Sequence, residues 1–187
     1  VQSAVDDLGR RGPVVVCGHS FGGYPVTALD PTGIARLVYL CAFLPDDRLW
    51  FDELPVFPSY FEMVAFDDTG VMTTKPECAR ELFYNDCTDD DVAWTIPNMC
   101  SHSMEGADTV MQRPLWRRVP SLYVQCGLDN VLTQQYMAAA VRHVGQGMTI
   151  PTSHSPMISR PDLVADLLLS VVAELSRQPE QHSPDPA

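Results

Sequence analysis

Positive charge is scarce in this chain. Its 187 residues include 12 lysines and arginines against 24 aspartates and glutamates, which gives a formal net charge of −12 at neutral pH. Nucleic acids and anionic membrane surfaces repel a protein of that charge, so we expect neither of them to be a partner. Lys75 is the one lysine, so any chemistry that needs a lysine side chain depends on that position.

Long hydrophobic runs and cofactor motifs are also missing. No 18 consecutive residues are apolar, so the sequence predicts no membrane-spanning helix. No G-x-G-x-x-G follows a predicted strand, no phosphate-binding loop ends in Gly-Lys, and no group of histidines and cysteines has metal-ligand spacing. We therefore expect the protein to work without a cofactor or a metal ion.

The six cysteines are not arranged as redox pairs. None of them forms a C-x-x-C motif, and Cys17, Cys41 and Cys126 lie within strongly apolar runs, where a free thiol behaves as a small hydrophobic side chain. We expect buried, reduced thiols, which favours a cytoplasmic location over an oxidising compartment. A targeting signal upstream of Val1 would lie outside this sequence.

Short apolar runs alternate with helical patterns along the chain. Four runs lack polar alternation and are predicted to form strands covered on both faces: residues 13–17, 36–42, 121–126 and 147–150. The clearest helix, at 162–177, has a polar position every fourth residue and a wide apolar face that we expect to pack on a sheet. This order predicts an α/β fold with a mostly parallel sheet and helices on both faces.

The stretch from 46 to 118 interrupts this alternation. It is rich in aromatic residues and methionine, and we interpret it as a mostly helical insertion between two strands of the sheet. The predicted organisation has a first core segment, the insertion, a second core segment and a proline-rich disordered tail, at residues 1–45, 46–118, 119–177 and 178–187.

The segment "VVVCGHSFGG", residues 14–23, takes the first predicted strand into a serine flanked by glycines. The pattern G-x-S-x-G between a strand and a helix is typical of a nucleophile elbow, a tight turn that presents the hydroxyl of Ser20 above the sheet. Gly18 and Gly22 are expected to leave out Cβ atoms that would obstruct this turn, and the N–H of Phe21 is the candidate oxyanion donor. The competing interpretation is a strand–helix turn that uses small residues only for packing.

A serine hydroxyl needs a general base, and the base needs an acid that orients it. Asp129 follows the predicted strand at 121–126, and His154 lies between the last predicted strand and the final helix. The order serine, aspartate, histidine along the chain is the one that follows a nucleophile elbow. Ser20, Asp129 and His154 are therefore the predicted catalytic residues.

Other residues remain candidates for these roles. An ordinary loop carboxylate is the alternative interpretation of Asp129, and Asp46 and Asp47, which follow the second predicted strand, are rival acids. A surface-loop histidine is the alternative interpretation of His154. His19 lies within the elbow beside the serine and is a candidate substrate contact. The remaining histidines fit the role of base less well: His102, His143 and His182.

Together these segments resemble the α/β-hydrolase superfamily, and within it the small serine esterases related to plant methylesterases and hydroxynitrile lyases. The resemblance extends over residues 5–177 and is carried by "GHSFGG", "LVYLCAFLPDD", "LFYNDC", "PSLYVQCGLDNVLT" and "PTSHSPMISRPDLVADLL". Its most specific parts are the elbow and the S-H-S-P-x-x-S-R-P segment. It implies that Ser20 is the nucleophile, Asp129 the acid and His154 the general base. It also implies that the insertion is a cap over the substrate pocket.

Members of that group open with further strands and a His-Gly loop that supplies a second oxyanion donor. The residues before Gly18 contain neither of these. The apolar strand at 13–17 would then be an edge strand, which invites aggregation. We therefore expect the sequence to be the C-terminal two-thirds of a longer enzyme whose N-terminal strands are missing here.

The leading functional hypothesis is a serine hydrolase that cleaves a small or medium carboxylic ester through an acyl-enzyme. One alternative is lyase-type acid–base chemistry on the same three residues, as in the resembling hydroxynitrile lyases, where a cap lysine often assists. Another is a ligand-binding homologue without catalysis. A small-molecule ester is the expected partner, and a homodimer is one of the association states left open.

Overall fold

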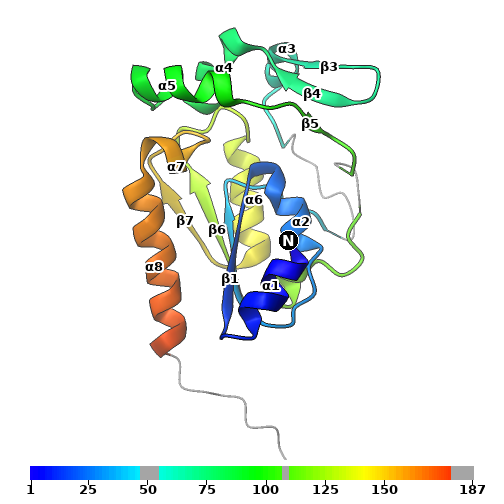
Figure 1. Cartoon of the computed structure of the whole chain (residues 1–187), viewed down its shortest axis with the longest axis vertical. Helices are drawn as coiled ribbons and strands as arrows, with labels where there is room; N and C mark the ends of the chain where they lie inside the picture. Colours follow the sequence, from blue (N-terminus) through cyan, green and yellow to red (C-terminus); the bar gives the residue numbers. More distant parts are fainter. Residues whose placement is uncertain (47–54, 107–109, 178–187) are drawn as a thin grey trace, which may run out of the picture.

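The core of the molecule is a four-stranded parallel sheet between helices (Figure 1). The computed structural model describes residues 1–46, 55–106 and 110–177. The predicted α/β architecture is confirmed, and all four apolar runs form strands, with ends displaced by one or two residues in the first two. In spatial order the strands are β1, β2, β6 and β7, which span Val14–His19, Ile34–Leu40, Ser121–Cys126 and Gly147–Ile150.

The two central strands, β2 and β6, are the most deeply buried part of the sheet. Tyr39 of β2 and Tyr123 of β6 are fully buried, with stacked rings 6.4 Å apart. Their hydroxyls still have partners, since that of Tyr39 lies 2.8 Å from the hydroxyl of Thr27 and that of Tyr123 donates to the carbonyl of Ala42. Buried polar groups need such partners, so the tyrosines fix how β2 and β6 pack against their surroundings.

Strands β7 and β1 lie at the two edges of this sheet, and the prediction that they are covered on both faces is wrong, since only Ile150 of β7 is buried. Strand β1 is also incompletely buried. In the described residues it pairs only with β2. Cys100 is exposed and so is Cys17 of β1, so the prediction of buried thiols is wrong for these two, whereas Cys41 and Cys126 are buried as predicted. For Cys17 the physical reason is position, because an edge strand lacks the neighbour that covers a central strand. All six cysteines are free.

Helices cover the sheet unequally. One side is covered by α1, α2 and α6, and the other by α8 (Figure 1). The side chain of Thr133 caps the start of α6 by accepting from the N–H of Tyr136, and Gly145 ends that helix with a left-handed φ of 80°. The core helices span Gln2–Gly9 (α1), Gly23–Thr27 (α2), Gln134–Val144 (α6), Pro156–Ser159 (α7) and Pro161–Arg177 (α8).

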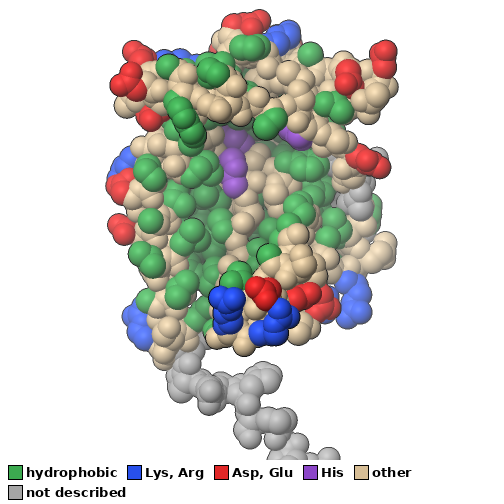
Figure 2. All heavy atoms as spheres, viewed as in Figure 1, with side chains coloured by type: hydrophobic (Ala, Val, Ile, Leu, Met, Phe, Trp, Pro, Cys, Tyr) green, Lys and Arg blue, Asp and Glu red, His purple; other side chains and the backbone are tan. Residues whose placement is uncertain are grey.

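The predicted wide apolar face of α8 is covered only in part. Only Leu167 and Val171 of this helix are buried, whereas Leu169 is 65% exposed and Val172 is 46% exposed. Leu163, Val164 and Leu168 are partly buried and also pack against the core, so one face of α8 contacts the core while a second apolar side is exposed. In the described part of the chain no helix of comparable length lies beside α8 on its side of the sheet, and Figure 2 shows hydrophobic side chains on that surface.

The insertion forms an upper layer, which we define as residues 60–103, above the sheet in Figure 1. The prediction of a mostly helical segment missed a three-stranded antiparallel sheet in it. Its helices are α3 (Tyr60–Met63), α4 (Pro76–Phe83), α5 (Asp89–Thr95) and a 3-10 helix (Ile96–Asn98), and its strands are β3 (Val64–Phe66), β4 (Val71–Thr74) and β5 (His102–Ser103). A further 3-10 helix, Leu115–Arg117, leads back to the core.

A tight turn creates the unexpected hairpin of β3 and β4. One carboxylate oxygen of Asp67 accepts from the backbone N–H groups of Thr69 and Val71, and Gly70 adopts a left-handed φ of 78°. Aspartate and glycine at these positions are typical turn formers. The sequence "FDDTGV" thus contained a hairpin signal between two short apolar strands.

Two sequence predictions fall on residues that the structure does not describe. The rival acid Asp47 and the tail at 178–187 lie outside the described ranges. Within those ranges, no helix is both long enough and apolar enough to cross a bilayer.

Candidate active site

Ser20 directly follows β1 and is the first residue of a 3-10 helix, Ser20–Gly22, that runs directly into α2. Its φ is 52°, a left-handed value that is uncommon for any residue except glycine. Backbone strain of this kind concentrates at functional sites, because the surrounding structure must hold it in place. The strand, strained serine and helix reproduce the nucleophile-elbow arrangement that the sequence predicts.

The glycines around Ser20 serve different purposes. A Cβ atom on Gly18 would lie 3.0 Å from the carbonyl oxygen of Gly22 and from Cγ2 of Val26, so Gly18 does make room for the turn. A Cβ on Gly22 would meet no heavy atom within 4 Å, which contradicts the prediction for that residue. Gly23 has the tightest position, since its Cβ would lie 1.8 Å from the carbonyl oxygen of Phe43.

Gly23→Ala is therefore expected to destabilise the protein. The added carbon overlaps the backbone carbonyl oxygen of Phe43, which cannot rotate away, so the loop that contains Phe43 must move. This movement also disturbs the hydrogen bond from the N–H of Phe43 to the carbonyl of Ser20. We expect the free energy of unfolding, measured by urea denaturation, to fall by about 3 kcal/mol. Gly22→Ala is the matched control, with an expected change below about 1 kcal/mol. Equal losses in the two variants would contradict this account.

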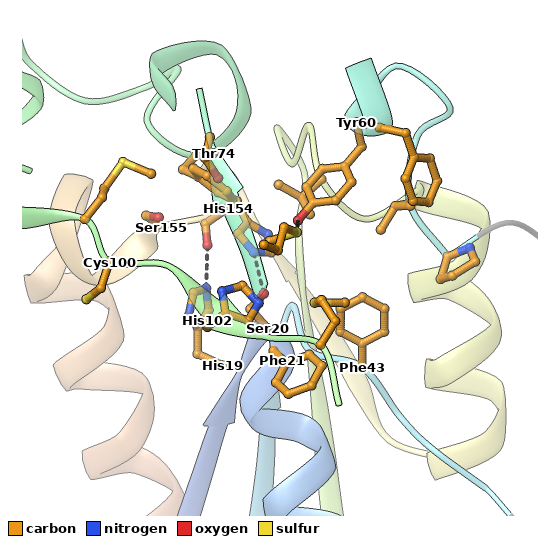
Figure 3. A pocket seen from close by; sticks show the side chains of 18 of the residues that line it. His19, Ser20, Phe21, Phe43, Tyr60, Thr74, Cys100, His102, His154 and Ser155 are labelled. Carbon is orange, nitrogen blue, oxygen red and sulfur yellow. Dashed lines mark hydrogen bonds between the residues drawn. The ribbon is translucent and has the colours of Figure 1, made fainter. Parts of the chain in front are cut away.

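The residues that the sequence predicts to act together are in contact. His154 Nε2 lies 2.8 Å from Ser20 Oγ (Figure 3), and His154 Nδ1 lies 2.7 Å from Asp129 Oδ2. The other oxygen of Asp129 accepts from the backbone N–H groups of Val131 and Leu132, at 2.7 and 2.9 Å. Because an ionised carboxylate only accepts, Nδ1 of a neutral His154 carries the proton, and Nε2 is left to accept from the serine hydroxyl.

The rival acid Asp46 does not take this place. Its buried carboxylate forms an ion pair with Arg117, with 2.7 Å between Oδ2 and the guanidinium nitrogen. The described carboxylate that contacts His154 is that of Asp129, and both of these side chains are buried. The geometry therefore favours Asp129 over Asp46 as the acid.

His19 contacts the backbone of His154 rather than its ring nitrogens. Its Nε2 lies 2.7 Å from the carbonyl oxygen of His154 and donates to it (Figure 3). Burial lowers the pKa of His19 to about 4, with a smaller contribution from the nearby His154 ring. His19 is therefore neutral at physiological pH. It also lines the pocket described below, where its predicted contact with substrate remains a prediction.

The low pKa of His19 predicts a pH-dependent stability. The unfolded chain binds a proton on this residue near pH 6.5, whereas the folded chain binds it only near pH 4. Stability from this group is thus complete above pH 6.5 and is lost as the pH falls towards 4. Between pH 7 and 5 the loss is at most about 2 kcal/mol, because pH 5 lies about 1.5 units below the unfolded pKa and each unit is worth about 1.4 kcal/mol.

His19→Gln should remove this component, because glutamine does not titrate and its amide can still donate to the same carbonyl. Urea unfolding at pH 7 and pH 5 measures the effect in both proteins. We expect the wild-type chain to lose more stability on acidification than the variant does. The same pH dependence in both would show that His19 is not the group responsible.

A cavity of about 430 Å³ lies between the sheet and the upper layer, and Ser20 and His154 form part of its wall. Histidine side chains are visible from outside at the junction of the two layers (Figure 2). No charged residue is among those described as lining it, so the cavity suits an uncharged, largely apolar ligand. Its apolar lining comes from both layers and includes Phe21, Tyr24, Phe43, Tyr60, Phe61, Phe66, Met72, Phe83, Met99 and Met104 (Figure 3).

His102 was not predicted to act at the site, but the structure places it at this cavity. It comes from β5, and its ring centroid lies 5.5 Å from that of Phe21. Lys75 is exposed and does not line the cavity, and its Nζ donates to the carbonyl of Glu62. The lyase alternative, which would use a lysine at the site, gains no support from this position.

One group of described residues brings metal-binding atom types together. His19, Cys41 and His154 each offer an atom within 4.8 Å of the others. His19 Nε2 and Cys41 Sγ already donate to the carbonyl oxygen of His154, while the ring of His154 contacts Ser20 and Asp129. These donors are engaged with one another, so we assign no metal to them.

Comparison with known proteins places this geometry in context. Polyneuridine aldehyde esterase matches with a TM-score of 0.77 at 20% identity, over 91% of this chain and 76% of that one. A methylesterase from Arabidopsis matches with a TM-score of 0.71 at 20% identity, over 92% and 74%. A pyrethroid hydrolase from Sphingobium faniae matches with a TM-score of 0.68 at 21% identity, over 95% and 78%. These likenesses show the fold.

A search of curated protein sequences gave no significant match. The family model described as the alpha/beta hydrolase family matches residues 1–167. Because that match extends over most of the chain and includes the positions of Ser20, Asp129 and His154, the protein is a member of the alpha/beta hydrolase family.

Proposed function

We propose that the protein is a serine esterase that cleaves a small or medium, uncharged carboxylic ester. The observation that supports this most directly is the continuous hydrogen-bonded chain from Ser20 through His154 to Asp129 beside an apolar cavity. This arrangement contains a nucleophile, a base within hydrogen-bonding distance of it and an acid that orients the base.

In the proposed reaction the substrate carbonyl lies beside Ser20 in the cavity. His154 Nε2 takes the hydroxyl proton as Ser20 Oγ adds to the carbonyl carbon, and Asp129 stabilises the imidazolium that forms. The imidazolium then protonates the alkoxide as the ester C–O bond breaks, so the alcohol leaves and the acyl group remains on Ser20. Water repeats these steps with His154 as base, releasing the acid and restoring the serine.

The negative charge that develops on the carbonyl oxygen needs hydrogen-bond donors. The N–H of Phe21, the residue after the serine, is the donor that the elbow supplies in this fold. Loss of one oxyanion donor costs about 10²–10³ in kcat in serine hydrolases. The proposal therefore depends on the backbone of Phe21 staying free to face the cavity.

The lining of the cavity supports the substrate class. Aromatic and methionine side chains favour an apolar acyl or alcohol part, and the absence of charged residues from the described lining disfavours a charged one. The names of the structural neighbours, two esterases and a hydrolase, agree with the proposed ester hydrolysis.

Pre-steady-state kinetics with p-nitrophenyl acetate, butyrate and octanoate test this function. An acyl-enzyme predicts a burst of p-nitrophenolate equal to the enzyme concentration, followed by slower steady turnover. A charged analogue, p-nitrophenyl succinate, is the matched control and should react more slowly than the butyrate. A folded chain that turns over none of these esters would overturn the proposal.

A further inference from the structure

One short segment of the upper layer contacts both loops that hold the predicted acid and base. It comprises residues 81–87, which are the end of α4 and the start of the loop to α5, and we call it the clamp segment. On the Asp129 side, Asn85 Nδ2 donates to the carbonyl of Leu128 at 3.0 Å, and Asn130 Nδ2 donates to the carbonyl of Glu81 at 2.8 Å. These bonds enclose Asp129 from the residues immediately before and after it.

On the other side, Asp86 binds the loop of His154. Its Oδ2 accepts from the backbone N–H of Ser153 and from the hydroxyl of Ser159, each at 2.9 Å. The hydroxyl of Ser153 donates in turn to the carbonyl of Phe83, at 3.1 Å. Ser153 is fully buried, so its N–H has no access to water that could replace the carboxylate.

We propose that Asp86 is a positioning residue for His154, an inference that rests on the proposed function. Its carboxylate fixes the backbone one residue before the histidine and a side chain five residues after it. Hydrogen bonds to a charged acceptor are stronger than those between neutral groups, so one carboxylate can hold both ends of this turn. Asp86 is not among the residues that line the cavity, and so it acts through the histidine loop rather than on the substrate.

The same segment also places an aromatic ring against the base. The ring of Phe83 lies 5.7 Å from that of His154, and both side chains line the cavity. A ligand that displaces Phe83 would therefore also displace the clamp segment, which contacts the loop of His154. The upper layer thus contributes to the position of the base as well as to the wall of the cavity.

Three variants test the role of Asp86: Asp86→Ala, Asp86→Asn and Asp90→Ala. Alanine removes the acceptor, asparagine keeps one acceptor oxygen, and Asp90 is a matched exposed carboxylate in the first turn of α5. For p-nitrophenyl butyrate we expect Asp86→Ala to lower kcat about 10–100-fold with KM changed less than about 3-fold, because small misplacement of a catalytic group costs up to about 10² in rate. Asp86→Asn should recover much of this loss, and Asp90→Ala should stay within about 2-fold of wild type.

The rate at which a fluorophosphonate labels Ser20 gives a second readout that is independent of substrate fit. It should fall in Asp86→Ala in parallel with kcat. If that variant does not fold, Ser159→Ala removes one of the two bonds and should lower kcat about 3–10-fold. Unchanged kcat in a folded Asp86→Ala or Ser159→Ala, or a raised KM alone, would overturn the positioning role. A wild-type chain with neither turnover nor labelling would overturn the proposed function itself.

Discussion

Ser20→Ala is expected to lower kcat on p-nitrophenyl butyrate by about 10⁵–10⁶-fold. Alanine has no oxygen to form the acyl-enzyme, so the hydrogen-bonded pair of His154 and Asp129 has no hydroxyl to deprotonate. Removing one member of such a unit costs about as much as removing all of it, since the members act together. KM should change little, because the cavity that binds the substrate keeps its shape. Steady-state kinetics at high enzyme concentration measures kcat and KM. A near-ultraviolet circular dichroism spectrum checks that the variant keeps the wild-type fold.

A control for this variant is Ser176→Ala, which removes an exposed hydroxyl near the end of α8. Its kcat should stay within about 2-fold of wild type. Residual activity of Ser20→Ala within 100-fold of wild type would contradict the assignment of Ser20 as nucleophile. It would point instead to water activated directly by His154.

Asp129→Asn is expected to lower kcat by about 10⁴-fold while leaving the fold intact. Oδ1 of Asp129 accepts from the N–H groups of Val131 and Leu132, so the amide oxygen of asparagine takes that place. Its NH₂ group then faces His154 Nδ1 and donates to it. This interaction favours the tautomer with the proton on Nε2, which can no longer accept the proton of Ser20.

The rival acid offers the matched comparison. Asp46→Asn removes the charge of a buried carboxylate that pairs with the half-exposed Arg117, so it should lower the free energy of unfolding by about 1–2 kcal/mol, yet keep kcat within a few-fold. Kinetics and urea denaturation on both variants separate the two carboxylates. If Asp46→Asn abolished activity and Asp129→Asn did not, Asp46 rather than Asp129 would have to be assigned as the acid.

The parts of the fold that the sequence predicted have local causes. The strands at 121–126 and 147–150 have the predicted limits in the structure, and the apolar run of β6 is buried, whereas β7 is exposed except at Ile150. The elbow is recognisable because a left-handed serine between a strand and a helix needs small neighbours. Asp129 and His154 could be found because each follows a strand end, and the ends of parallel strands meet at one edge of the sheet.

The features that could not be predicted depend on contacts between distant segments. Gly23 is required by the carbonyl of Phe43, which lies beyond the next strand, so its role is invisible in the elbow motif. In the sequence Asp86 cannot be told apart from the other acidic residues of its charged stretch. Its role depends on hydrogen bonds from Ser153 and Ser159, which are distant in the sequence. The exposure of Leu169 likewise depends on what else covers that side of the sheet. Apolar periodicity alone cannot supply this information.

Intact-mass analysis after treatment with a fluorophosphonate tests the central claim most directly, because the reagent reports an activated serine without any choice of substrate. We expect a single adduct that peptide mapping places on Ser20. That adduct should be absent from Ser20→Ala and should form at least about 10³-fold more slowly in His154→Ala. An adduct on another residue, or undiminished labelling in either variant, would contradict the account.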